Sequence, residues 1–170
     1  MDFDLTEDQL ALRAGAGEVL DDLTSPARVR RHTTTDAPFD RALWQAMVDQ
    51  GWGRIVTIVS DAGRRGERFQ AIYGAAKAGA MGFVRGLAAE VGAHGVTANC
   101  VALGTMKTGP TEDAIARNPE LEAKLARPYT IPRLGRPRDP AVLVALLCSE
   151  AGGWITGQVY PVDGGYASSL

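Results

Sequence analysis

The sequence predicts an α/β protein in which helices flank a parallel sheet of about three strands, preceded by a wholly helical N-terminal segment. Short apolar, β-branched stretches after residue 52 alternate with longer helical patterns, which is the rhythm of a parallel α/β sheet. The first fifty residues show helical patterns alone. With 170 residues, 45% of them hydrophobic and 22% charged, the chain can bury one sizeable core.

Helix start and stop signals indicate the N-terminal helices. Thr6 is a good N-cap, and Gln9, three positions later, completes a capping-box pattern. Asp40 can cap a later helix over residues 41–50, with apolar residues on one face and Gly51 as its stop. Leu10, Val19 and Leu20 give a rough apolar stripe, and we expect residues 1–50 to be wholly helical.

The rest of the chain is expected to alternate strands and helices. Residues 54–59 form an apolar, β-branched run typical of a buried strand, and residues 71–93 follow as a long helix that Gly95 ends. Pro161 makes the last strand a candidate for the sheet edge, because proline cannot donate to a strand ladder. The remaining expected elements are, in chain order, a strand, a polar helix, an apolar helix and a short strand over residues 96–103, 111–126, 138–149 and 158–162.

Composition and charge exclude several classes of protein. The formal net charge of −2 argues against a nucleic-acid surface, which carries a basic excess. No apolar run reaches transmembrane length, and the acidic N-terminus lacks a signal-peptide core. Cys100 and Cys148 lie in apolar contexts, and we interpret both as reduced core residues. We therefore expect a cytoplasmic protein that binds neither nucleic acid nor a membrane.

Ser60, Tyr73 and Lys77 are the candidate catalytic residues. Ser60 stands just past the end of the strand 54–59, while Tyr73 and Lys77 are four positions apart on one face of the helix 71–93. A strand end and a helix face can bring three polar groups to one point. The same residues could also be an ordinary strand end and an amphipathic helix surface.

A family resemblance extends from residue 42 to residue 170. The stretches GRIVTIVSDAG, YGAAKAG, GVTANCVALG, IPRLGRPRDP and ITGQVYPVDGG follow one another in order. Together they resemble the C-terminal half of a short-chain dehydrogenase/reductase, in particular a 3-oxoacyl-[acyl-carrier-protein] reductase. The resemblance implies a truncated Rossmann-like sheet and NAD(P)-dependent reduction of a ketone or a 3-oxoacyl thioester, as in fatty acid metabolism.

The resemblance gives each candidate residue a role. Near neutral pH a free phenol holds its proton too tightly for efficient acid-base work, and a nearby ammonium favours the phenolate. Tyr73 would therefore supply the proton, with Lys77 as its activator and Ser60 as a donor to the substrate oxygen. The implied contacts with the cofactor NAD(P) come from Tyr73, Lys77, Gly104, Met106 and Thr108.

The sequence departs from this family in its nucleotide site. Such reductases hold the pyrophosphate on a Gly-x3-Gly-x-Gly turn, where backbone N–H groups and the helix dipole meet it. The chain has no such turn, because Gly15 and Gly17 lie within a helical pattern and follow no strand. Asn99 and Asn118 both follow Tyr73, so the family's catalytic asparagine has no counterpart. Two alternatives therefore stay open: a catalytically silent relative that acts as an interaction subunit, and a remnant without activity.

Residues 1–41 resemble a different family. The stretches FDLTEDQLALR and DAPFDRALWQAMVDQGW resemble the start of an acyl-CoA dehydrogenase, a helical flavoenzyme. They cover no flavin-binding or catalytic residue of that family, so they imply no flavin, and we expect no metal. The simplest interpretation is a fused chain, with domains 1–41 and 42–170, in which a helical piece replaces the nucleotide-binding half of a reductase.

The expected partners also follow from the reductase resemblance. The substrate would be a small molecule or an acyl thioester. The helix that bears Tyr73 packs against its copy in reductase tetramers, which implies a homo-oligomer, and pairing with a full-length reductase is the alternative. Arg64, Arg65 and Arg68 could meet an anionic thioester carrier, and a solvated loop explains them equally well. Without its former neighbour, the strand 54–59 would expose an edge that favours self-association.

Overall fold

The computed structural model describes residues 41–166, and within them the predicted fold class is confirmed. One parallel sheet has the strand order β1-β2-β3. The three strands are β1 (Gly53–Ser60), β2 (Val96–Leu103) and β3 (Val159–Val162). The chain divides into two compact units, Met1–Ala46 and Met47–Leu170, and the sheet belongs to the second. The helices expected over residues 1–40 lie outside the described part.

The middle strand, β2, carries the core of the sheet. It pairs with β1 along its whole length, from Gly53 opposite Val96 to Ser60 opposite Leu103, and with β3 at its carboxyl end. Seven of its eight residues are buried, because a central parallel strand is covered on both faces. Within residues 41–166, β1 and β3 are the two edges, and Pro161 is exposed on β3 as expected.

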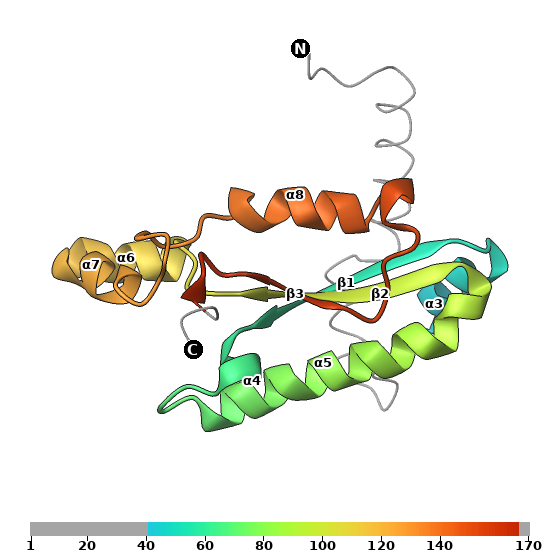
Figure 1. Ribbon diagram of the computed structural model, residues 1–170, viewed down its shortest axis with the longest axis horizontal. Helices are drawn as coiled ribbons and strands as arrows, with labels where there is room; N and C mark the ends of the chain where they lie inside the picture. The colour runs from blue at the N-terminus through green and yellow to red at the C-terminus, as the bar shows by residue number, and fades with distance from the viewer. Residues whose placement is uncertain (1–40, 167–170) are drawn as a thin grey trace, which may run out of the picture. The chain divides into compact units, whose positions relative to one another are not determined.

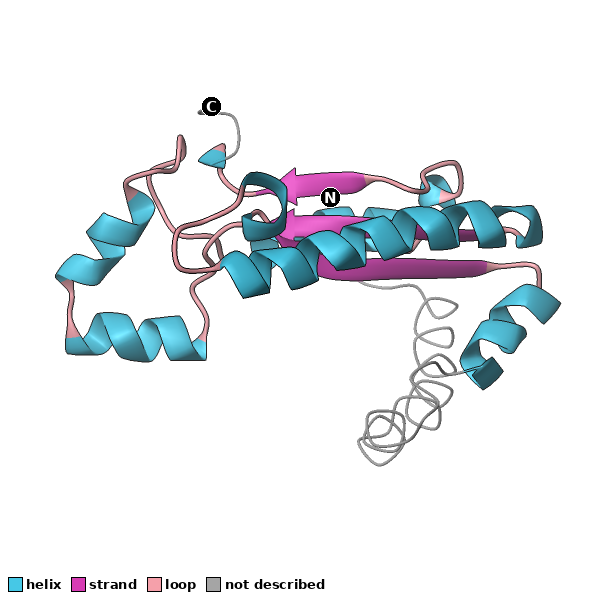
Figure 2. Cartoon of the chain, turned by 90° about the horizontal axis from the view of Figure 1, so that it is seen from below, coloured by secondary structure: helices cyan, strands magenta, loops and turns pink. Residues whose placement is uncertain are grey.

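Two helices cover the faces of this sheet. The helix α5 (Ala71–Val91) buries Met81, Val84, Leu87, Ala88 and Val91, which lie on one side of the helix. The helix α8 (Arg138–Leu147) covers the opposite face and buries Leu147 completely (Figure 1). Figure 2, drawn from the α5 side, shows this helix lying along the strands. Because the three strands are parallel, they end at the same edge of the sheet, where the connecting segments can form a site.

The connecting segments hold the differences from the sequence prediction. The single helix expected over 111–126 is wrong: two helices, α6 (Gly109–Arg117) and α7 (Glu120–Ala126), lie there. Asn118 between them is extended, because the proline that follows disfavours helical backbone. A short helix, α4 (Ala62–Arg65), was not expected after β1, whereas α3 (Arg41–Asp49) confirms the helix predicted there.

The two cysteines differ in burial. Cys100 on β2 is fully buried, as expected, and both cysteines are free thiols. The prediction that Cys148 lies in the core is wrong, because Cys148 is exposed. It follows the last residue of α8, and the preceding Leu147 takes the position that faces the sheet. No helix among residues 41–166 is long and apolar enough to cross a membrane.

Gly95 is a position where a side chain cannot be accommodated. Its φ of +69° follows the 3-10 turn η1 (Gly92–His94), and a Cβ there would lie 2.2 Å from the carbonyl oxygen of Gly51. We expect Gly95→Ala to lower the free energy of unfolding by about 2–4 kcal/mol, from backbone strain and overpacking. Thermal and denaturant unfolding measure it. The control Gly109→Ala adds a Cβ in open space, and equal unfolding midpoints in the two variants would contradict the assignment.

Candidate functional site

Ser60 and Tyr73 meet at the carboxyl end of β1. The Ser60 Oγ accepts a hydrogen bond from the backbone N–H of Ala62 (3.2 Å), which fixes the hydroxyl at the start of α4. Tyr73 lies in the first turn of α5 and is 47% exposed. The two side chains line one cavity of about 220 Å³. Its other lining residues are Glu67, Gln70, Leu103, Gly104 and Thr105.

A glycine on α5 permits this approach. A Cβ on Gly74 would lie 2.8 Å from the carbonyl oxygen of Ala62, so a larger residue would push α5 away from α4. Because Gly74 follows Tyr73 directly, the close packing of the two helices also sets the position of the phenol relative to Ser60. The contact between Gly74 and the backbone of Ala62 is therefore what brings Tyr73 close to Ser60.

Lys77 is not among the residues that line this cavity, but it lies next to Tyr73. Its Nζ is 5.7 Å from the centroid of the Tyr73 ring. The ammonium donates a hydrogen bond to the carbonyl oxygen of Ile58 on β1 (3.4 Å). The structure thus brings Ser60 and Tyr73 to one cavity and places the Lys77 ammonium next to the phenol ring, on the backbone of the edge strand.

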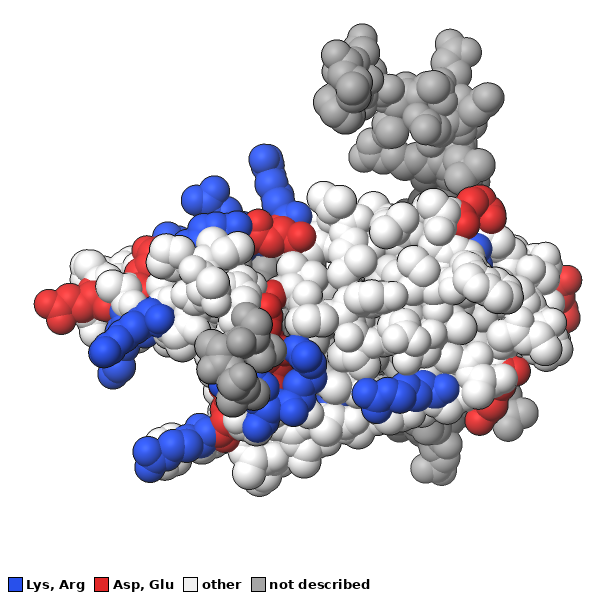
Figure 3. Space-filling view, in the orientation of Figure 1, with Lys and Arg blue, Asp and Glu red and all other residues white. Residues whose placement is uncertain are grey.

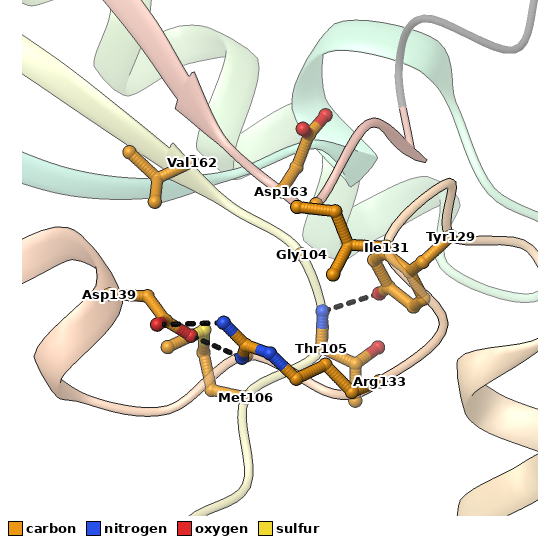
Figure 4. Close-up of a pocket in the computed structure, with 11 residues that line it drawn as sticks. Gly104, Thr105, Met106, Tyr129, Ile131, Arg133, Asp139, Val162 and Asp163 are labelled. Carbon is orange, nitrogen blue, oxygen red and sulfur yellow. Dashed lines mark hydrogen bonds and ion pairs between the residues drawn. The ribbon is translucent and has the colours of Figure 1, made fainter.

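The predicted cofactor loop after β2 spreads over two cavities. Gly104 lines the first cavity and also a second one of about 240 Å³. Met106 lies in the second cavity only, where it forms an isolated bridge with Gly135 (Figure 4). Thr108 is the N-cap of α6 and is not among the residues that line either cavity. Of the three loop residues, only Gly104 therefore shares a cavity with Ser60 and Tyr73.

The second cavity has a wall that the sequence reasoning missed. The hydroxyl of Tyr129 accepts a hydrogen bond from the backbone N–H of Thr105 (2.6 Å), and its ring packs against Gly104. Arg133 donates two hydrogen bonds to Asp139 at 2.7 and 3.0 Å (Figure 4). The hydrogen bonds from the Arg133 side chain, and then one from the backbone of Arg136, lower the pKa of Asp139 to about 2. No pattern in the sequence indicates the Tyr129 contact, which joins residues from different connecting segments.

The three arginines between Ser60 and Tyr73 contact other side chains of the same protein. Arg64 bonds to Asp61 (2.7 Å). Arg65 stacks over the Tyr166 ring, with 4.2 Å from its Cζ to the ring centroid, and Arg68 lies 5.2 Å over that of Phe69. The first two interactions tie these side chains to the protein, which weakens the case for a carrier-binding cluster.

No group of three or more His, Cys, Asp or Glu side chains within residues 41–166 could hold a metal ion.

The buried Asn99 has a structural place instead of a catalytic one. Its side chain donates to the carbonyl of Ile155 (2.7 Å) and accepts from the N–H of Gln158 (3.1 Å), which holds the segment before β3 against β2.

Known proteins resemble this chain in sequence and in fold. The profile of the family described as Enoyl-(Acyl carrier protein) reductase matches residues 39–167. The Acetoacetyl-CoA reductase of Allochromatium vinosum is 37% identical over 125 residues, which are 74% of this chain and 50% of that protein. The 3-oxoacyl-[acyl-carrier-protein] reductase FabG of Vibrio cholerae is 35% identical over 161 residues, 95% of this chain and 62% of that protein.

Solved structures give the same result. The structure called "ElxO with NADP Bound" superposes with a TM-score of 0.72 and 30% identity, over 75% of this chain and 52% of that one. A gluconate 5-dehydrogenase from Beutenbergia cavernae, described as putative and with bound NADP, gives 0.69 and 35% identity, over 75% and 51%. The chain thus spans about half the length of most of these relatives. The matched sequence profile, the relatives and the shared fold show that the chain belongs to the short-chain dehydrogenase/reductase family of oxidoreductases.

Proposed function

We propose that the chain is an NAD(P)-dependent reductase of a ketone or a 3-oxoacyl thioester. The observation that carries this proposal is the cavity at the end of β1, which Ser60 and Tyr73 line together. In this proposal Tyr73 gives a proton to the carbonyl oxygen, and Ser60 donates a hydrogen bond that orients it. Lys77, 5.7 Å from the phenol ring, supplies positive charge beside the developing phenolate.

The described residues fit the nicotinamide end of the cofactor. Ser60, Tyr73 and the backbone at Gly104 face one cavity, so a flat ring could lie there between a phenol and polar groups. Bound there, the nicotinamide would supply the hydride. Met106 and Thr108 lie further along the same loop, and we propose them as outer contacts. The sequence offers no glycine-rich turn for the pyrophosphate, so this chain would hold the cofactor at one end only.

The proposed substrate class rests on the relatives. Two of them carry the names Acetoacetyl-CoA reductase and 3-oxoacyl-[acyl-carrier-protein] reductase, and both names describe reduction of a 3-oxoacyl thioester. Acetoacetyl-CoA is therefore the probe of choice, with NADPH as the reductant. Oxidation of NADPH by the purified chain, dependent on acetoacetyl-CoA, supports the proposal. A folded chain without such turnover contradicts it.

A second candidate function is that of an interaction subunit without catalysis. The bond from Lys77 to the carbonyl of Ile58 favours it, because an ammonium held by a strand edge is withdrawn from a ligand. The chain also spans about half the length of most of these relatives, and a full-length reductase is a natural partner. Co-purification with a full-length reductase, without turnover by the chain alone, supports this candidate.

We also propose a cytoplasmic location for the protein. For residues 1–41 we propose a fused origin.

We further propose that α5 pairs with its copy in a homo-oligomer. An apolar stripe of exposed residues runs along α5 at helical spacing. Its members are Ile72, Ala76, Gly79, Phe83 and Gly86. Ile72 is 89% and Phe83 61% exposed. Figure 3 shows a broad surface without charged side chains between α8 and α5. The small residues of this stripe, Ala76, Gly79 and Gly86, let two helices approach closely.

Phe83→Asp is expected to convert the oligomer to a monomer, because it places a charge in the middle of an apolar helix contact. Light scattering after size-exclusion chromatography measures the mass. The control Arg85→Asp changes an exposed residue on another side of α5 and is expected to keep the oligomer. A monomeric wild-type chain, or an oligomer that survives Phe83→Asp, contradicts the α5 interface.

A further inference from the structure

Asp61 is a buried carboxyl group directly after Ser60. Its side chain is 1% exposed and belongs to the largest fully buried side chains of the described residues. The Oδ1 accepts a hydrogen bond from Arg64 (2.7 Å). The Oδ2 is buried and has no hydrogen-bond donor among residues 41–166. A buried carboxylate oxygen without a hydrogen-bond donor costs free energy. The Oδ2 of Asp61 therefore needs a proton, and Arg64, which bonds to the Oδ1, does not supply it.

A second carboxyl group, from the far side of the sheet, meets Asp61. The backbone N–H of Asp61 donates to the carbonyl of Leu103 (3.1 Å), and Leu103 is in register with Val162 on β3. Asp163 follows Val162, and its carboxyl group is within hydrogen-bond reach of that of Asp61. Two carboxylates can bond to each other only through a shared proton, because both are acceptors when ionised.

Two cations lie near Asp61. Arg64 bonds to its carboxylate, while Lys77 on the adjacent α5 donates to the carbonyl of Ile58. Burial is the largest of the effects that raise the pKa of Asp61 to about 6. The bond from Arg64 lowers that pKa and the contact with Asp163 raises it. The shared proton is therefore lost between mildly acidic and neutral pH.

Asp163 begins a short segment, residues 163–166, that closes the wall of the second cavity. The carbonyl of Gly164 accepts the N–H of Ile131 (2.9 Å), and the Tyr166 ring lies 5.0 Å from that of Tyr129. Tyr129 in turn binds the N–H of Thr105 at the cavity floor. Figure 4 shows the carboxylate of Asp163 turned away from Arg133 and Asp139, the other charged pair there.

The far end of the segment contacts α4 and the loop after it. Arg65 stacks over the Tyr166 ring and donates to its backbone carbonyl. Burial and then Glu67 raise the pKa of the Tyr166 phenol, so this ring stays neutral across the range in question. The titration of the Asp61 and Asp163 pair is thus the step that changes charge where the segment begins.

We propose that Asp61 and Asp163 share one proton and that this pair is a pH-sensitive latch, which holds residues 163–166 against the second cavity and releases them when the proton leaves. The proton is bound more tightly in the closed, folded state than in the open one. The latch is therefore fully closed below the ordinary pKa of an aspartate, 3.8, and weakens as the pH rises towards about 6. Above that pH two carboxylates face each other, and Arg64 bonds to that of Asp61.

Hydrogen exchange on the full chain tests the latch. Between pH 4.5 and 7, after correction for intrinsic exchange, the amides of residues 129–131 and 163–166 are expected to lose protection by about tenfold or more. Asp61→Asn should remove most of this pH step, because an amide keeps a donor at every pH. The control Asp139→Asn should retain the step, because the pKa of Asp139 is lowered to about 2, below the range.

A titration of the carboxyl carbons by NMR keeps the test independent of any variant that fails to fold. The wild-type chain should show an aspartate that titrates near pH 6 and a second signal that moves with it. A protection profile without a pH step, an undiminished step in Asp61→Asn, or no aspartate midpoint above pH 5 each overturns the latch.

Discussion

Tyr73→Phe is expected to abolish reduction of acetoacetyl-CoA by this chain. The substitution keeps the ring and removes the proton that the proposed reaction needs at the carbonyl oxygen. A positioned general acid contributes about 10²- to 10⁴-fold to a rate, so the variant should fall by at least the lower figure. The decrease of NADPH absorbance at saturating acetoacetyl-CoA measures the turnover. Because Tyr73 is 47% exposed, the loss of its hydroxyl should leave stability nearly unchanged.

The matched control is Tyr160→Phe. Tyr160 lies on β3, is part-buried, and is not among the residues that line the two cavities, so its variant should keep the wild-type rate. Ser60→Ala gives a graded comparison, since it removes a hydrogen bond to the substrate and leaves the proton donor in place. Turnover that persists in Tyr73→Phe at the rate of the Tyr160→Phe control would refute the assigned proton donor.

NADPH is expected to bind this chain with a dissociation constant of about 1 mM or weaker, a free energy no better than about −4 kcal/mol. The cavity shared by Ser60 and Tyr73 can accept the nicotinamide end, and the sequence has no glycine-rich turn for the pyrophosphate. Such a turn, at a helix N-terminus, supplies backbone N–H groups and a favourable dipole to the phosphates. Calorimetric titration with NADH and with NADPH measures the affinity.

Reduced nicotinamide mononucleotide provides the control ligand for this prediction. It has the nicotinamide and lacks the adenosine half, so it should bind about as weakly as NADPH if only the nicotinamide end is held. A clear advantage of NADPH would reveal contacts to the adenosine half that the sequence does not indicate. Sub-micromolar binding of NADPH would overturn the prediction outright.

The sequence predicted the sheet better than the connections. The β-branched runs of β1 and β2 are confirmed as strands nearly to the residue. Among the described strands only the central β2 is buried on both faces; the prediction that residues 54–59 form a buried strand is wrong, because β1 is an edge and Ile58 is 46% exposed. The break between α6 and α7 was missed because Pro119 was not weighed against a helical pattern that continues beyond it. Cys148 was misplaced for a different reason: apolar neighbours predict a buried segment, and only the packing of α8 decides which side faces the sheet.

The candidate site divides in the same way. Ser60 and Tyr73 could be assigned to one end of the sheet from their spacing, and the structure places them in one cavity. Their catalytic roles stay a prediction. The acid after Ser60 is visible in the sequence, and its burial is not, because an Asp after a strand is usually exposed at a turn.

By itself, the sequence determined the order of the three strands, the long helix after the first of them, the family, and the meeting of a serine and a tyrosine at the strand ends. These features depend on local patterns and on short spacings along one strand and one helix. The tertiary structure alone decided that Lys77 bonds to Ile58, that Tyr129 holds Thr105, and that Asp61 meets Asp163. Each of these contacts joins segments far apart in the chain, and its energy depends on burial and distance, which only the folded backbone sets.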